Sequence, residues 1–129
     1  MKRHINLNEF KKLGMEFDIE DKTYKIDFIP APIEEDMFSK FDELNSWLAD
    51  PTKLNQEQKD IISDWIWQTV NFDRNGNGDI DKNYFFSYIG VTERFILLTL
   101  IIDLIGDRMK KMQEIFSDPE KKTVKNIKT

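Results

Sequence analysis

The hydrophobic pattern of this chain changes its period once, near residue 30, and that change constrains the fold more than any other feature. Residues 15–20 alternate between apolar and acidic side chains, and the alternation resumes over residues 23–29 after a short polar link. Two runs of period two joined in this way predict a β-hairpin with one apolar face. Because a two-stranded hairpin is only marginally stable alone, we expect that face to pack on other elements.

Beyond residue 30 the apolar residues recur at helical spacing. A first helix is predicted over residues 33–48, and Pro51 ends it. Asn55 and Gln58 resemble a capping box at the start of a second helix, whose apolar stripe covers residues 61–70. The chain therefore turns from a hairpin into a succession of amphipathic helices.

Two further helices and one turn complete the expected architecture. A short helix is predicted over residues 82–89, and a long one over residues 92–116, where the Ser-Asp-Pro run at 117–119 ends it. A single helical turn is predicted over residues 8–14. We expect a mainly helical α+β fold, with an N-terminal β-hairpin packed on a bundle of about three to four helices.

Length and composition indicate one folded domain. The chain has 129 residues, of which 40% are hydrophobic and 12% aromatic, and this is enough to bury a real core. We expect residues 1–116 to form a single compact domain. Residues 117–129 are polar and rich in lysine, and we expect them to form a flexible tail.

Charge and cysteine content exclude several classes of function. The net charge of −5 argues against binding nucleic acid, because phosphates require a basic face. The chain has no cysteine, so disulfides and zinc–thiolate sites are excluded. The most apolar stretch, residues 95–105, is shorter than the roughly 20 residues that span a bilayer. We therefore expect a soluble, cytoplasmic protein that contacts neither nucleic acid nor membrane.

The segment at 73–84 resembles a calcium-binding EF-hand loop that lacks its last ligand. Oxygen-bearing side chains fall at loop positions 1, 3, 5 and 9, and a glycine falls at position 6. Position 12, which normally supplies a bidentate glutamate, is Tyr84, and a phenol cannot replace a carboxylate. The candidate ligands are Asp73, Asn75, Asn77, Asp79 (through its carbonyl) and Asp81. The segment is either a weak, degenerate Ca²⁺ site or a structural turn rich in Asn and Gly, and the sequence favours the turn.

Catalysis finds no support in the sequence. The only histidine is His4, so neither a Ser–His–Asp triad nor a histidine-based metal site can form within one chain. Gly76 and Gly78 are not followed by the lysine of a phosphate-binding loop. We therefore predict a protein that is not an enzyme and needs no cofactor.

Two features indicate a protein partner instead. Trp67 lies opposite the apolar stripe of its helix, and tryptophan is enriched at interface hot spots. The helix that contains Phe95, Leu98 and Ile102 is apolar on nearly every side. Such residues are either enclosed by the rest of the fold or contact another chain, which would be a partner protein or a second copy.

The order of elements resembles that of the tail assembly chaperones of long-tailed bacteriophages. The resemblance covers residues 5–116 and rests on an acidic hairpin (MEFDIEDKTYKIDFIP), an acidic helix (IEEDMFSKFDELNSWL) and the amphipathic helices that follow, in a small, acidic chain without cysteine. It implies a non-catalytic factor that binds an apolar helical client such as a tape-measure protein, in the cytoplasm of a bacterial host. It has no motif that assigns functional residues.

Overall fold

A hairpin followed by helices makes up the fold, as the change of period predicts. The computed structural model describes the backbone of Leu7 and residues 14–128, with side chains up to residue 115. The elements are β1 (Met15–Ile19), β2 (Lys22–Ile26), α2 (Ala31–Ser39), α3 (Phe41–Ala49), η1 (Pro51–Lys53), α4 (Gln56–Val70), η2 (Asp73–Asn75), α5 (Lys82–Tyr88) and α6 (Val91–Lys128). The mainly helical α+β class is confirmed. The helical turn predicted over residues 8–14 lies, except for Gly14, outside the described residues.

The hairpin is antiparallel and buries one face. Met15 of β1 lies opposite Ile26 of β2, and both side chains are buried. Phe17 and Tyr24 form the next apolar pair, with ring centroids 5.5 Å apart. The intervening side chains are exposed, so the predicted alternation is confirmed. Strand β2 ends at Ile26, three residues before the predicted end.

The single helix predicted over residues 33–48 is in fact two helices. The break is at Lys40, which has the non-helical backbone angles φ −112° and ψ 20°. The turn brings Trp47 into the core, where its ring stacks on Trp65 of α4 with centroids 6.1 Å apart. Phe41 belongs to the apolar residues at helical spacing that we expect to be buried in the predicted helix, but it is 51% exposed.

Helix α4 is the centre of the packing. Its predicted capping box is confirmed, because the Asn55 side chain accepts a hydrogen bond from the Gln58 N–H and the Gln58 side chain accepts one from the Asn55 N–H. The helix contacts α2, α6 and the hairpin strand β2. Its buried side chains are Ile62, Trp65, Ile66, Thr69 and Val70. The hairpin face is thus covered by helices, as its marginal stability requires.

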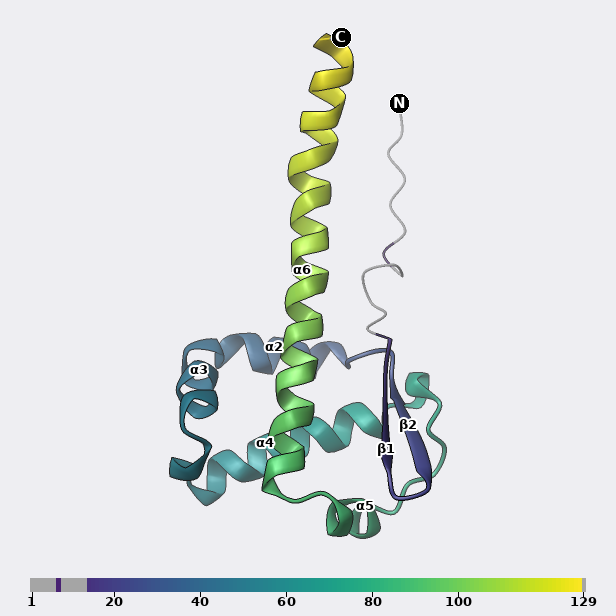
Figure 1. Cartoon of the computed structure of the whole chain (residues 1–129), viewed down its shortest axis with the longest axis vertical. Helices are drawn as coiled ribbons and strands as arrows, with labels where there is room; N and C mark the ends of the chain where they lie inside the picture. Colours follow the sequence, from purple (N-terminus) through teal and green to yellow (C-terminus); the bar gives the residue numbers. More distant parts are fainter. Residues whose placement is uncertain (1–6, 8–13, 129) are drawn as a thin grey trace.

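Helix α6 is much longer than predicted. Its backbone is helical as far as Lys128, and in Figure 1 its second half stands clear of the other helices and the hairpin. A proline within a helix costs about 3 kcal/mol but does not forbid the helix, and the glutamate and lysines after Pro119 are good helix formers. In the described part of the chain, no helix is both long enough and apolar enough to cross a membrane.

Candidate functional site

An apolar groove lies between α2, α3 and the middle of α6. Its volume is about 450 Å³, within the range of ordinary ligand sites. Helices α2 and α3 form one wall, to which they contribute Met37, Phe38, Phe41, Leu44 and Leu48. Helix α6 forms the other wall with Ile102, Ile105 and Met109. We call this site the helical groove.

The floor of the helical groove is part of the core, whereas its rim is exposed. Met37 and Leu44 are almost fully buried. Phe38 is 41% exposed and Phe41 is 51% exposed. These two residues flank the break at Lys40, so the end of α2 and the start of α3 both present a phenylalanine to solvent. Large aromatic side chains left at the rim of a groove are typical of binding surfaces.

The polar residues around the groove are mostly acidic. Glu34, Asp103 and Asp107 line it, and Lys110 is the cation among its lining residues. Glu34 forms an ion pair with Arg108, which ties α2 to α6 across one end of the groove. Burial lowers the pKa of the Arg108 guanidinium from its usual value, but a group with so high a pKa remains charged. Because Arg108 pairs with Glu34, the other charged lining residues are Asp103, Asp107 and Lys110.

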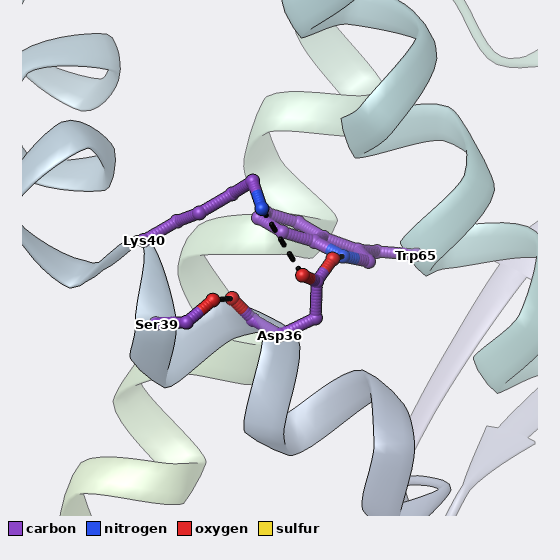
Figure 2. Close-up of polar contacts among 4 residues, drawn as sticks. All are labelled: Asp36, Ser39, Lys40 and Trp65. Carbon is purple, nitrogen blue, oxygen red and sulfur yellow. Dashed lines mark hydrogen bonds and ion pairs between the residues drawn. The ribbon is translucent and has the colours of Figure 1, made fainter.

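A polar cluster fixes the orientation of α2 against α4 (Figure 2). The Trp65 indole N–H donates a 2.7 Å hydrogen bond to Asp36 Oδ2, and Lys40 Nζ lies 3.1 Å from Asp36 Oδ1. The Ser39 hydroxyl donates to the carbonyl of Asp36. The hydrogen bond from Trp65, and then that from Lys40, lower the pKa of the Asp36 carboxyl. The cluster holds the helix that carries Met37 and Phe38.

The four side chains predicted as partner contacts lie in different environments. Trp67 is half-buried, and its ring centroid lies 6.1 Å from those of Phe85 and Phe86. It therefore attaches α5 to α4 and is not an open anchor. Leu98 has no exposed surface, so it is a core residue, which corrects its prediction as a partner contact.

The other two predicted contacts are partly exposed, and one of them is in the groove. Phe95 is half-buried beside a smaller hollow at the start of α6. Ile102 lines the helical groove. The sequence did not identify the other apolar lining residues as partner contacts, among them Phe38, Phe41 and Met109. Phe38 and Phe41 lie on either side of the break at Lys40, which the helical spacing did not predict.

The Asn-rich loop that resembles an EF-hand binds the backbone of the hairpin. Asn75 Oδ1 accepts hydrogen bonds from the N–H groups of Asp27 (2.9 Å) and Phe28 (2.7 Å). Its Nδ2 donates to the carbonyls of Phe28 and Thr69. Asn77 bonds in the same way to both backbone groups of Lys25. Two of the oxygens that a calcium ion would need already accept backbone hydrogen bonds.

The acidic residues of the loop do not converge on a common point. Asp81 caps α5 by accepting hydrogen bonds from the N–H groups of Asn83 and Tyr84. Asp73 and Asp79 are exposed. Among the described residues, no three His, Cys, Asp or Glu side chains form a group that could hold a metal ion. The geometry favours the structural turn over the calcium site.

Comparisons with known proteins give no family for this chain. No protein-family model, no curated protein and no solved structure matches it.

Proposed function

We propose that this protein is a non-catalytic assembly factor that binds an apolar helical segment of another protein in the helical groove. The observation that supports this is the pair of exposed phenylalanines, Phe38 and Phe41, at the rim of a groove of about 450 Å³. An amphipathic helix binds such a groove by inserting side chains spaced three and four residues apart. The resemblance to tail assembly chaperones suggests the client, an apolar helical segment such as those of a tape-measure protein.

Acidic groups around the groove fit this role. Apolar client segments aggregate when they are exposed, and a carrier with a charged surface keeps the complex in solution. Glu34, Asp103 and Asp107 line the groove, and the exposed Asp42 and Glu43 lie on the outer side of α3. The proposed client is therefore apolar on the face that binds, and lysine or arginine beside that face strengthens binding.

Fluorescence anisotropy with labelled, tiled segments of a phage tape-measure protein tests the proposal. We expect at least one apolar segment to bind, and a scrambled segment of the same composition not to bind. Phe41→Glu should weaken binding by about tenfold or more, because it places a charge at the rim of the groove. Ile96→Glu is the matched control, since Ile96 is 53% exposed on α6 but does not line the groove.

Two outcomes contradict the proposal. One is that no segment binds the wild-type protein. The other is that Ile96→Glu weakens binding as much as Phe41→Glu, because binding would then be nonspecific and not located in the groove.

A further inference from the structure

Most of the second half of α6 packs against no other element in the part of the chain that the structure describes. We call residues 109–128 the arm. Met109 and Lys110 at its base still line the helical groove, and Figure 1 shows the rest of the segment extending away from the body formed by residues 14–108. Beyond its base, none of the other described elements lies beside it. Isolated helices of this length are marginal in water, so most of their stability comes from packing an apolar face. A partner that packs on the apolar residues of the arm would therefore stabilise this helix.

The apolar core stripe of α6 continues into the first turns of the arm. Leu98, Ile102, Ile105, Met109 and Met112 follow the alternating spacing of four and three residues that is typical of a coiled coil. The first three contribute to the core or to the helical groove. Met112, in the arm, is 40% exposed. The apolar stripe thus begins in the part of α6 that packs on the body and ends in the arm, where Met112 is exposed.

Charge distinguishes the arm from the body. The body contains 20 acidic and 9 basic residues, whereas the arm contains six lysines and three acidic residues. Lys110, at the base of the arm, lines the groove of its own chain, but the rest of the arm extends away from that groove because it is continuous with α6. A second copy of the chain offers this part of the arm an apolar groove lined by Asp103 and Asp107.

We propose that two copies of this chain form an antiparallel dimer, in which the basic arm of each copy lies along the helical groove of the other. A parallel dimer would place arm against arm and body against body, so that like charges face each other. The antiparallel arrangement places each lysine-rich arm against the partner's carboxylates. The charge distribution therefore favours the partner's arm as the ligand of the helical groove and the antiparallel orientation of the two chains.

The dimensions are sufficient for a stable dimer. An arm of this length extends about 30 Å and is about 10 Å wide, so each arm covers about 300 Å² of its partner. Two arms and the two surfaces that they cover bury about 1,200 Å² in total, which is the lower end of the range for specific complexes. The dimer is therefore expected to dissociate on dilution, since oligomer stability depends on protomer concentration.

This inference depends on the proposed function, because it gives the helix-binding groove a second ligand. Sedimentation velocity of the full chain tests it. The apparent mass should rise from 15.4 kDa toward twice that value as the protein concentration increases. Added salt should weaken the dimer, because salt screens the attraction between arm and body.

Two single substitutions locate the interface. Met112→Glu should increase the dimer dissociation constant by about tenfold or more, because it places a carboxylate on the apolar face of the arm. Gln113→Glu adds the same charge at the neighbouring exposed position and should change the constant much less. Equal effects of the two substitutions would overturn the assignment of the interface.

Cross-linking tests the orientation, since the chain has no cysteine of its own. Chains carrying Lys121→Cys, near the end of the arm, are mixed with chains carrying Asn45→Cys, at the groove. A short thiol cross-linker should join the two kinds of chain, and Lys121→Cys chains should not link to each other. Self-linking of Lys121→Cys overturns the antiparallel arrangement. A strict monomer that still binds the helical segments through Phe41 overturns the dimer but not the proposed function.

Discussion

Replacing Asn75 by alanine removes four hydrogen bonds between the η2 loop and the rest of the fold. The bonds to the N–H groups of Asp27 and Phe28 and to the carbonyl of Phe28 have no substitute among the interactions described. Thr69 keeps a second bond, because its carbonyl also accepts from the Phe72 N–H. A typical hydrogen bond contributes about 1 kcal/mol net, and a buried group left without a partner costs about 1–3 kcal/mol. We expect Asn75→Ala to lower the free energy of unfolding by about 3 kcal/mol.

Thermal and urea denaturation, followed by circular dichroism, measure this change. For a domain of this size, about 3 kcal/mol corresponds to a decrease in Tm of about 10 °C. Asp73→Ala is the control, because Asp73 is exposed at the start of the same loop. It should change stability by less than about 0.5 kcal/mol.

Asn75→Asp separates the structural turn from the calcium site. In a calcium loop, an added carboxylate at this position strengthens cation binding. In this structure, it replaces the Nδ2 donor by an oxygen that faces the carbonyls of Phe28 and Thr69, so the repulsion should destabilise the fold at least as much as alanine does. Calorimetry should detect no calcium binding at millimolar concentration. An Asn75→Asp variant that is as stable as the wild type, or that binds calcium at micromolar concentration, refutes this reasoning.

Trp47→Ala should cost about 4 kcal/mol in urea denaturation, whereas Phe41→Ala should cost less than about 1 kcal/mol, because only Trp47 is enclosed in the core. The lowered pKa of Asp36 means that its ionised form stabilises the fold above about pH 4 and loses this contribution as the pH falls through the lowered pKa. The stability of Asp36→Asn should therefore depend less on pH in that acidic range. Gly76→Ala should cost about 1 kcal/mol, because φ at Gly76 is 68°.

Local signals in the sequence were sufficient for some elements. The hairpin follows from alternation within each strand, and the start of α4 follows from the reciprocal bonds between Asn55 and Gln58, three residues apart. The Asn and Gly residues of the 73–81 segment indicate a turn, and the structure has the 3-10 turn η2 and a left-handed Gly76 there. In each case the residues that determine the structure are neighbours in the chain.

Features that depend on distant partners were not predictable in the same way. The break at Lys40 serves the contact between Trp47 and Trp65, which belong to different helices. Asn75 bonds to backbone groups as many as 48 residues away, so no local pattern distinguishes it from a metal ligand. The helical groove likewise combines side chains from α2, α3 and α6, which are distant in the chain. Tertiary contacts, and not propensity, decide these positions.

The bonds between Asn77 and Lys25 have a consequence for association through the hairpin. Strand β2 pairs with β1 on one side, and no other described strand pairs with its other side. Such an edge can recruit strands from other molecules and seed aggregation. The Asn77 side-chain amide accepts from the Lys25 N–H at 2.7 Å and donates to the Lys25 carbonyl at 2.9 Å, which are the bonds that a neighbouring strand would make. The Asn77 amide therefore caps this edge of β2, and this edge resists growth by strand addition.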